Sequence, residues 1–568
     1  MASGTEFDVI VVGAGPAGSA CALSLAREGV NVLMLEKGKV PGERNMSGGV
    51  LYGDFDGHFG MINLLPDFEA TAPLQRKIVS HEVLVLDRPD WKTNLVKYYR
   101  VTKNSLSAKS GFITMDVETG HDYTVLRRGF DHWMASLAVQ AGAMLATETT
   151  VLDLLTDGGV VTGVRTTSEE IRSKLVVDCS GVTSTLVQKA GLRGRLVPRD
   201  LYHGTKRVYK LDPDKIEKRF KVKPGEGRSM TFLGSFMHHV SGGAFIYTNR
   251  DTLSVGVVAS MDSLIRTTTE KFEEVGKLID VQDDFESHPM VAELLEGAEC
   301  VEYSAHNIPK GYKCILKKPY ADGYLAAGDA MGAFVKVGPM IDGMRRAIAS
   351  GMMAASAYLQ ASTSGSFRAR NLSRYRDLLT PVYEDVNRSG RDAFISESSF
   401  TYNTLPSIIF GTPFMAKTRQ IVVKKSEKEE DRDAFSVVQA GTSLLNYDED
   451  KDFSHIRVDA ELASKSITKP WVPVCPTNCY TLLTSKGVFA SYKDLYDHDL
   501  SELSANGTPD EDLSKKAKKA ALEEIAAGTV RFDHVACVAC GSCGAIGPEE
   551  MVLFDNERKG HGVRYAFG

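Results

Sequence analysis

An apolar run, a glycine-rich turn and a helix-forming stretch follow one another near the amino terminus, and this order restricts the fold more than any other feature. Residues 8–37 read DVIVVGAGPAGSACALSLAREGVNVLMLEK. Gly13 suits a tight turn, Gly15 lets the backbone approach a pyrophosphate, and Gly18 lets a helix pack closely on a strand. Glu36 ends the second apolar run, where a carboxylate accepts hydrogen bonds from ribose hydroxyls. The sequence therefore predicts a βαβ unit that binds a dinucleotide.

Three later segments favour FAD over NAD as this dinucleotide. Arg127 precedes an amphipathic helix, and the apolar run KLVVDCSG places Asp178 and Gly181 at its end. The segment GYLAAGDAMGAF, with Gly328 and Asp329, resembles the second FAD fingerprint of glutathione-reductase-type flavoproteins, in which the aspartate binds the ribityl chain. The alternatives are a surface arginine at position 127 and an ordinary helix cap at position 329.

A helix rich in small residues is predicted over IDGMRRAIASGMMAASAYL, residues 341–359, after Gly338. Glycine and alanine let a helix approach a cofactor closely, and the amino end of a helix favours negative charge at the flavin's pyrimidine edge. Simple close packing of helices is the alternative.

The last hundred residues carry a cysteine pattern that is incomplete for two clusters and complete for one. Cys537, Cys540 and Cys543 follow one another at three-residue spacing, and Cys475 precedes a proline. In two-cluster ferredoxins each cluster takes three thiolates from one such run and the Cys-Pro cysteine of the other. Here the second run has Gly547 before its proline. The three matching positions of the first run hold Lys465, Thr468 and Trp471. One 4Fe-4S cluster, in a ferredoxin-like α+β domain, is expected.

Two alternatives concern the same cysteines. A structural zinc site also uses CxxC pairs, but its ligands usually come as two separated pairs, whereas this set has a run of three and a distant Cys-Pro. Cys479, four residues after Cys475, is a second candidate for the fourth ligand. The proline context favours Cys475, and a small buried packing residue is the other interpretation of Cys479.

Composition restricts the classes of function. A length of 568 residues predicts two to four domains. The net charge of −6 argues against nucleic-acid binding, and the remaining cysteines show no disulfide-like spacing, which indicates a reducing compartment. The first strand starts about seven residues from Met1, so we expect no signal or transit peptide. No apolar run reaches the roughly 18 residues that span a bilayer.

The segment ERNMSGGVLYG, residues 43–53, adds family-level information. Together with the two FAD fingerprints, the cysteine pattern and the closing residues GVRYAFG, it resembles the electron-transfer flavoprotein:quinone oxidoreductase family. The similarity is strongest to the FixC branch, with a FixX-like ferredoxin fused behind it. It covers nearly the whole chain and is most specific at residues 1–60, 320–360 and 530–568.

The resemblance implies one FAD and one 4Fe-4S cluster, no acid–base triad, and electron flow from reduced electron transfer flavoprotein, with its alpha and beta subunits, to a membrane quinone. In Fix-type systems that partner is in some cases bifurcating. The expected location is the cytoplasmic side of a prokaryotic membrane, peripheral or monotopic. The alternatives are an FAD-dependent prenyl lipid reductase resembling geranylgeranyl reductase, which generally lacks a fused ferredoxin, and a non-catalytic assembly partner.

Specific residues follow from the fingerprints and the resemblance. The predicted FAD site consists of Gly13, Gly15, Gly18, Glu36, Lys37, Ser47, Gly48, Arg127, Asp178, Gly181, Gly328, Asp329 and Gly338. Gly242 and Gly243, in HHVSGGAFIYT, are expected in the quinone pocket, and an ordinary glycine bulge in a strand is the alternative. The predicted cluster ligands are Cys475, Cys537, Cys540 and Cys543.

The predicted fold is an α/β FAD-binding domain of the glutathione-reductase type with an inserted antiparallel-sheet domain and a ferredoxin-like domain. The boundaries are 1–185 and 318–424 for the FAD domain, 186–317 for the quinone-binding sheet, 425–452 for a charged linker and 453–568 for the ferredoxin. The apolar segment from Tyr402 to Met415 is expected either to contact a bilayer surface or to pack under the ferredoxin. A polar insertion at about 496–527 contains a predicted helix that stops at Gly528.

Overall fold

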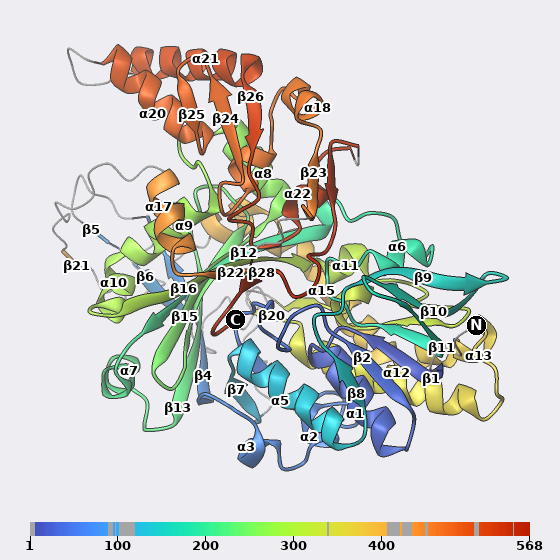
Figure 1. Cartoon of the computed structure of the whole chain (residues 1–568). Helices are drawn as coiled ribbons and strands as arrows, with labels where there is room; N and C mark the ends of the chain where they lie inside the picture. Colours follow the sequence, from blue (N-terminus) through green and yellow to red (C-terminus); the bar gives the residue numbers. More distant parts are fainter. Residues whose placement is uncertain are drawn as a thin grey trace.

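The protein has two large sheets beside each other and a carboxyl-terminal part that sits over them (Figure 1). The computed structural model describes residues 6–88, 95–96, 98–101, 120–337, 340–405, 421–422, 434–448, 453–504, 511–548 and 550–568. In Figure 1 the carboxyl-terminal part, residues 434–568, is orange to red, and its final strand descends to the centre of the molecule.

The first sheet contains the predicted βαβ unit. The strand order is β17-β18-β11-β1-β2-β8, and the strands from β18 to β8 run parallel. Strand β17 pairs antiparallel with β18 at one edge, and the β9–β10 hairpin pairs antiparallel with the first half of β11. The elements are β1 (Glu6–Val12), α1 (Pro16–Arg27), β2 (Val32–Leu35), β8 (Met144–Ala146), β9 (Val151–Asp157), β10 (Val160–Thr166), β11 (Glu170–Asp178), β17 (Tyr320–Ala321) and β18 (Tyr324–Ala326). The central strands are buried on both faces, which explains their continuous apolar runs.

Two predicted helices pack beside α1: α5 (Arg127–Gln140) and α12 (Met344–Ser362). The contact between α1 and α12 depends on small side chains, because a Cβ atom at Gly351 would lie 2.1 Å from the Ala17 carbonyl oxygen. The small residues of α12 therefore allow close packing on α1. The amino-terminal turn of the same helix also lies at a cavity described below, so both interpretations of this segment apply.

The second sheet is mixed and has the order β16-β12-β15-β14-β13-β4-β7-β3. Its strands are β3 (Val50–Tyr52), β4 (Lys77–Leu86), β6 (Tyr98–Val101), β7 (Asp122–Thr124), β12 (Leu201–Lys210), β13 (Glu226–Leu233), β14 (Gly242–Thr248), β15 (Thr252–Ser260) and β16 (Glu299–Pro309). This differs from the prediction in two ways. Residues 50–124 contribute strands to it, and β4 pairs with β13 in parallel, so the sheet is neither confined to 186–317 nor purely antiparallel.

The two faces of the second sheet have different neighbours. Helices α8 (Met261–Glu270) and α9 (Leu278–Ser287) cover one face, where Phe232 and Phe285 pack with ring centroids 5.0 Å apart. Alternation along β14 sends Phe245 and Tyr247 to the opposite face. That face looks toward the first sheet.

The carboxyl-terminal part is built from short strands and helices. They are α17 (Ala434–Thr442), β22 (Asn446–Asp448), β23 (Ile456–Val458), α18 (Ala460–Lys465), α19 (Trp471–Val474), β24 (Tyr480–Thr484), β25 (Gly487–Phe489), α20 (Tyr492–Leu503), α21 (Glu511–Ala527), β26 (Thr529–Phe532), α22 (Ser542–Ala545), β27 (Val552–Phe554) and β28 (Gly562–Arg564). Helix α21 ends directly before Gly528, as predicted. Helix α17 and strand β22 lie inside the predicted linker 425–452, whose more charged ends fall outside the described residues.

The carboxyl-terminal part shares a hydrophobic core with the second sheet. Phe272, which follows α8, meets Tyr492 of α20 edge to face, with ring centroids 6.3 Å apart. Trp471 and Leu495 belong to the same cluster of buried residues as Phe232 and Phe285. These two parts are therefore packed as one body.

The other short elements connect these layers. They are α2 (Met61–Leu64), α3 (Phe68–Thr71), β5 (Leu95–Val96), α6 (Leu186–Lys189), α7 (Pro213–Phe220), α10 (Pro289–Leu295), α11 (Gly311–Cys314), β19 (Val335–Val337), β20 (Met340–Asp342), α13 (Ala369–Leu372), α14 (Arg374–Leu378), α15 (Thr380–Ser396) and β21 (Ile421–Val422). Among the described residues, none of the helices has both the length and the apolar character needed to cross a bilayer. Most of the segment from Tyr402 to Met415 lies outside the described residues.

Candidate cofactor sites

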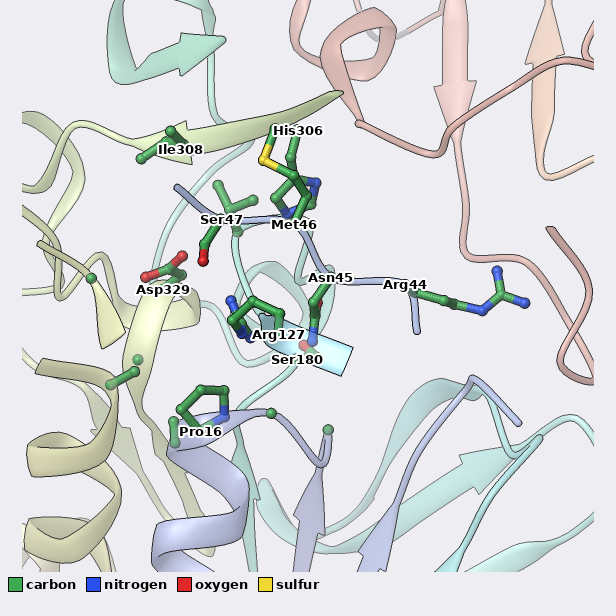
Figure 2. A pocket seen from close by; sticks show the side chains of 18 of the residues that line it. Pro16, Arg44, Asn45, Met46, Ser47, Arg127, Ser180, His306, Ile308 and Asp329 are labelled. Carbon is green, nitrogen blue, oxygen red and sulfur yellow. The ribbon is translucent and has the colours of Figure 1, made fainter. Parts of the chain in front are cut away.

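A cavity of about 210 Å³ lies between the carboxyl ends of the first sheet's strands and the face of the second sheet that carries Phe245 and Tyr247 (Figure 2). We call it the first cavity. The predicted cofactor residues that line it are Gly13, Gly15, Glu36, Lys37, Ser47, Gly48, Arg127, Gly181, Gly328 and Asp329. The carboxyl end of a parallel sheet is where open α/β folds place their ligands, so this position suits a dinucleotide.

The three glycines of the first loop have the separate roles that the sequence predicts. Gly13 has a φ of +97°, and a Cβ atom there would lie 2.6 Å from the Cys179 carbonyl oxygen. A Cβ atom at Gly18 would lie 1.9 Å from the Gly13 carbonyl oxygen, so this residue serves the helix–strand contact and does not line the cavity. At Gly15 the nearest atom is 3.7 Å away. The missing side chain of Gly15 therefore leaves space on the cavity side.

Glu36 lies at the end of β2 with its carboxylate turned toward the glycine loop. Its two oxygens accept the backbone N–H groups of Ala14 and Gly38, at 3.0 and 2.8 Å. Burial raises the pKa of Glu36, and these hydrogen bonds oppose the shift. The carboxylate thus fixes the loop and also borders the cavity, where ribose hydroxyls of a dinucleotide would lie.

Arg127 begins α5 and points into the first cavity (Figure 2). Its guanidinium makes a two-pronged ion pair with the fully buried Asp131, at 2.8 and 2.7 Å. Asn45 donates to the same carboxylate at 3.0 Å. The alternative of a surface arginine is wrong, because the side chain is enclosed and braced from two directions.

Asp329 and Ser47 both line the first cavity (Figure 2). Burial raises the pKa of Asp329 to about 6, and the charge of Arg127 opposes this shift. The Ser47 hydroxyl is buried and has no hydrogen-bond partner among the described atoms. Two polar groups that lack strong protein partners at one wall fit a polar ligand, as FAD's ribityl and pyrophosphate portions would be.

Asp178 does not line the cavity. Its carboxylate accepts hydrogen bonds from Ser180, Ser184 and Tyr324, at 2.6, 2.6 and 2.7 Å, and so fixes the end of β11. Gly338 lies outside the described residues.

The sequence did not reveal a contribution of the carboxyl-terminal part to this cavity. Lys37, predicted as a cofactor residue, places its ammonium 3.2 Å from Asn556 Oδ1 and 3.2 Å from Glu557 Oε2. Asn556 lines the first cavity. His306, on β16, lines it as well, and burial lowers its pKa to about 4, so it is neutral at pH 7. None of these contacts has a local sequence signal, because residues far apart in the chain form them.

The residues 562–568, which we call the closing segment, lie against the same wall. The segment donates an N–H to the Glu43 carbonyl oxygen at 2.7 Å. The carboxylate of Glu302 accepts the N–H groups of three successive residues, 566–568. The end of the segment packs against Asn45 and Arg127. The closing segment therefore packs against two residues that line the first cavity.

A second, smaller cavity borders the first one and contains both predicted quinone glycines. Its lining includes Gly242 and Gly243 with Tyr202 and Lys336, and it shares Phe245, Tyr247, Val258 and Ile341 with the first cavity. No register shift interrupts the pairing of β14 with β13 or β15. The alternative of a glycine bulge is therefore wrong. The glycines instead permit close strand packing, because a Cβ atom at Gly242 would lie 2.1 Å from the Val258 carbonyl oxygen.

Five cysteines converge on a third enclosed space, the cysteine cavity. They are Cys475, Cys479, Cys537, Cys540 and Cys543. The rest of the lining is largely apolar and includes Trp471, Val474, Ile546 and Phe554. The thiol of Cys479 is in hydrogen-bond contact with those of Cys475 and Cys537. The structure brings together all four predicted ligands and also the alternative one.

The loop around these cysteines directs polar hydrogens at sulfur. Ala539 and Gly541 have positive φ values of 50° and 79°, and the Ala539 N–H donates to Cys537 Sγ at 3.2 Å. His455 Nε2 lies 3.3 Å from the same sulfur. Such donors stabilise thiolates that bind metal.

Two positions that the sequence analysis matched to missing cluster ligands are filled by packed residues. Trp471, which stands where a ligand would be, is buried, and a Cβ atom at Gly547 would lie 2.8 Å from its ring. If the predicted two-cluster pattern applies, Trp471 and Gly547 stand where two cysteines would be, and their contact leaves no space there for ligands.

A short polar bridge joins the cysteine cavity to the first cavity. Ser542 Oγ lies 3.4 Å from Cys540 Sγ and donates to Asn307 Oδ1 at 2.8 Å. Asn307 lines the first cavity. His203 contacts both Ser542 and Asn307, at 3.1 and 3.0 Å, and burial lowers its pKa to about 4. Two side chains therefore separate a cysteine sulfur from the first cavity.

Among the described residues, His498, Asp499 and Glu502 are close enough together to hold a metal ion. They lie on α20 and line none of the three cavities described above. Asp499 is already paired with Lys486 at 2.6 Å. An acidic group of this kind on a helix surface does not by itself indicate a site.

Known proteins are similar to this chain in sequence. Residues 8–202 match the family model of FAD dependent oxidoreductases. Protein FixC of Escherichia coli strain K12 is 37% identical over 373 residues, which is 66% of this chain and 81% of FixC. FixC of Bradyrhizobium diazoefficiens is 33% identical, over 71% of this chain and 85% of its own. The probable electron transfer flavoprotein-quinone oxidoreductase YgcN of E. coli K12 is 35% identical, over 63% and 77%.

A solved structure supports the same fold. A geranylgeranyl bacteriochlorophyll reductase-like protein from Thermoplasma acidophilum superposes with a TM-score of 0.53, covering 77% of this chain and 99% of its own, at 22% identity. This likeness shows a shared fold only. The glycine loop, the first cavity and the sequence relatives agree with one another. The chain therefore belongs to the family of FAD-dependent oxidoreductases that includes FixC and the probable electron transfer flavoprotein-quinone oxidoreductase YgcN.

Proposed function

We propose that this protein is an electron transfer flavoprotein:quinone oxidoreductase. It would take electrons from reduced electron transfer flavoprotein, made of alpha and beta subunits, and pass them through one 4Fe-4S cluster and FAD to a membrane quinone. The observation that carries the proposal is the closeness of the two candidate cofactor sites. Ser542 contacts Cys540 on one side and Asn307 on the other, and Asn307 lines the first cavity.

The chain's own residues would hold both groups in place. The glycine loop leaves space for a pyrophosphate beside Gly15, and Glu36 and Asp329 border the positions of sugar hydroxyls. When bound, FAD exchanges electrons singly or in pairs, whereas an iron–sulfur cluster exchanges one at a time. The apolar lining of the cysteine cavity would exclude water. The hydrogen bond from the Ala539 N–H to Cys537 would favour the thiolate form of that cysteine. Gly338, predicted at the FAD site, and the ferredoxin-like character of residues 453–568 are part of this proposal.

The cluster is tested by composition and spectroscopy. The donor set consists of thiols around one enclosed space, which fits an iron–sulfur cluster, and Cys475 with Cys537, Cys540 and Cys543 is the proposed ligand set. Anaerobically purified protein should contain four irons per chain, and its redox titration followed by EPR should show one cluster. A zinc-containing protein without an EPR signal would contradict the proposal.

The fourth ligand is tested by a matched pair of variants. Cys475→Ser should lose the cluster signal, whereas Cys479→Ser, in the neighbouring thiol, should retain it. The reverse pattern would assign the ligand to Cys479.

The activity is tested anaerobically with reduced electron transfer flavoprotein and a short-chain quinone. Quinol formation that depends on both partners supports the proposal. Turnover of a polyprenyl lipid without quinol formation would favour the prenyl reductase that the shared fold also allows. Electron transfer flavoprotein that reduces a ferredoxin or flavodoxin at the same time would show a bifurcating partner.

We also infer a peripheral position on the cytoplasmic side of a prokaryotic membrane, because a membrane quinone must reach the second cavity. Flotation with vesicles made of neutral and anionic phospholipids tests it. Protein that stays entirely in the unbound fraction would contradict the inference.

A further inference from the structure

Buried charges lie together on one side of the second cavity. They belong to Lys336 on β19, Lys310 after β16 and Glu397 after α15, and the Tyr202 hydroxyl joins them from β12. Lys310 Nζ lies 2.9 Å from Glu397 Oε2, and Lys336 Nζ lies 4.0 Å from Glu397 Oε1. The Tyr202 hydroxyl donates to Glu397. Buried ions are costly unless they are paired, so a cluster of this kind requires an explanation.

The cluster extends from solvent to the cavity. At the outer end, Lys310 contacts Asp262 at 3.0 Å, and the Asp262 side chain is 53% exposed. At the inner end, Lys336 is only 8% exposed and lines the second cavity beside Gly242 and Gly243. The ion pairs therefore form a continuous connection from the surface to the inside.

The inner end also lies close to the candidate flavin site. The second cavity has a volume of about 30 Å³, which is room for about two water molecules. It shares Phe245, Tyr247 and Ile341 with the first cavity. A ligand at this junction would lie between the flavin site and the Lys336 ammonium.

The charge states suit proton transfer. Burial lowers the pKa of Lys336 to about 8, Glu397 opposes this shift and the charge of Lys310 adds to it. Burial by itself would raise the pKa of Glu397, but Lys336, Lys310 and the hydrogen bond from Tyr202 outweigh it, so the pKa is lowered. The aromatic ring of Tyr202 faces both ammonium groups, at 5.0 and 5.3 Å, and Tyr312 of α11 lies near Glu397 and Asp262. A lysine close to its pKa at neutral pH releases and regains a proton readily.

We propose that Lys336 is the proton donor for quinone reduction and that Asp262, Lys310 and Glu397 resupply its proton from solvent. This inference rests on the proposed quinone reductase activity. Quinone takes two electrons and two protons to become quinol. The electrons originate in reduced electron transfer flavoprotein, which is oxidised. Each protonation breaks an N–H bond of the Lys336 ammonium and forms an O–H bond of quinol, and the neutral amine then takes a proton that enters from water at Asp262.

The direct test compares two electron acceptors in the Lys336→Met variant. A short-chain quinone needs protons, whereas ferricenium takes one electron and no proton. Reoxidation of the reduced flavin, followed by its absorbance, should slow at least tenfold with quinone and stay within twofold of wild type with ferricenium. Lys313→Gln removes an exposed lysine charge nearby and should leave both rates unchanged. An unchanged ratio of the two rates in Lys336→Met would overturn the inference.

A pH profile separates proton donation from a structural role. The wild-type quinone rate should fall as pH rises through about 8, because Lys336 then loses its proton. Glu397→Gln removes the anion that supports the charged lysine, so this decline should move to lower pH even if the Lys336 variant fails to fold. Lys336→Arg keeps the charge but not the ready proton release, so it should preserve KM better than kcat. An alkaline decline that stays in place in Glu397→Gln would refute the role of this cluster.

The outcomes also separate this inference from the proposed function. Wild-type protein that reduces no quinone would refute the proposed activity itself. Wild-type protein that reduces quinone, with variants that keep the wild-type acceptor ratio and pH profile, would refute only the proton route.

Discussion

Two glycines at the amino-terminal end of α1 have different physical roles. Gly18 is required by the protein itself, since any side chain would meet the Gly13 carbonyl oxygen at 1.9 Å. Gly15 faces open space, with no atom closer than 3.7 Å to an added Cβ. One of these glycines therefore serves folding and the other serves binding.

This difference gives the first prediction. Gly18→Ala should lower the free energy of unfolding by about 2 kcal/mol or more with or without FAD, because the backbone must move. Gly15→Ala should leave the cofactor-free protein within about 0.5 kcal/mol of wild type and weaken FAD binding at least tenfold. Denaturant titration and FAD titration of the apoprotein measure both quantities. Gly194→Ala, where an added Cβ meets no atom within 4 Å, is the control and should change neither.

The second prediction concerns Glu557, which is 3% exposed and lies 3.2 Å from Lys37 and 3.4 Å from Arg44. Burial would raise its pKa, but the charges of Lys37 and Arg44, helped by His455, lower it to about 2. A carboxyl with a lowered folded-state pKa stabilises above its unfolded-state value and loses this effect as pH falls toward the folded-state value. Glu557→Gln should therefore cost about 3 kcal/mol at pH 7.

Thermal melts of the two proteins across a pH series check this expectation. The difference between wild type and Glu557→Gln should be full above about pH 4.5 and shrink below it, toward pH 2. A difference that does not depend on pH would show that packing, and not the ion pairs, causes the loss.

At the scale of elements, sequence periodicity correctly predicted the helices and strands that form within short stretches of the chain. The sequence around the glycine loop, Arg127 and Asp329 has clear apolar runs and helical periodicity. The structure confirms the predicted elements there as β1, α1, α5, β18 and α12. The pairing of β4 with β13 joins residues about 150 positions apart. No local signal encodes such a partner, so the sequence placed residues 50–124 with the wrong sheet. Asn556 at the first cavity was missed for the same reason.

The third prediction addresses the closing segment. Glu302 accepts three successive backbone N–H groups with one carboxylate. Glu302→Gln replaces one acceptor oxygen by a donor, so at least one of these groups loses its partner. Hydrogen exchange of residues 562–568 should become at least tenfold faster, and FAD should dissociate faster, because the segment packs against Arg127 and Asn45. Unchanged exchange in this segment would show that the pairing of β28 with β22 and the hydrogen bond to Glu43 hold it without Glu302.

At the scale of the whole molecule, the parts share contacts that separate domains would lack. Lys277, which precedes α9, donates to the carbonyl oxygens of Val472 and Cys475 at 2.6 and 2.9 Å. Tyr303 donates to the Pro476 carbonyl oxygen at 3.1 Å. The backbone next to a predicted cluster ligand is thus bound to the second sheet, and the core between them is continuous.

The fourth prediction follows from this continuity. The second sheet and the carboxyl-terminal part should unfold together. Unfolding of either part alone would expose the hydrophobic core that the two share. Hydrogen exchange across a urea series should give amides of β15 and β24 the same free energy of opening. Helix α21, in which only Ala517, Ala521 and Ile525 are buried, should open at lower urea. A separate, earlier opening of β24 would contradict a single cooperative body.

The position of the closing segment has a consequence for how the protein is made in the cell. Ribosomes add about 5 to 20 residues per second, and amino-terminal parts generally fold first. The glycine loop and Arg127 emerge early, but residues 562–568, which pack beside Arg127 and Asn45, emerge on the order of half a minute later. Two residues of the cavity lining, Asn45 and Arg127, therefore gain this support only when synthesis reaches residues 562–568. We expect nascent chains stalled before these residues to retain FAD poorly.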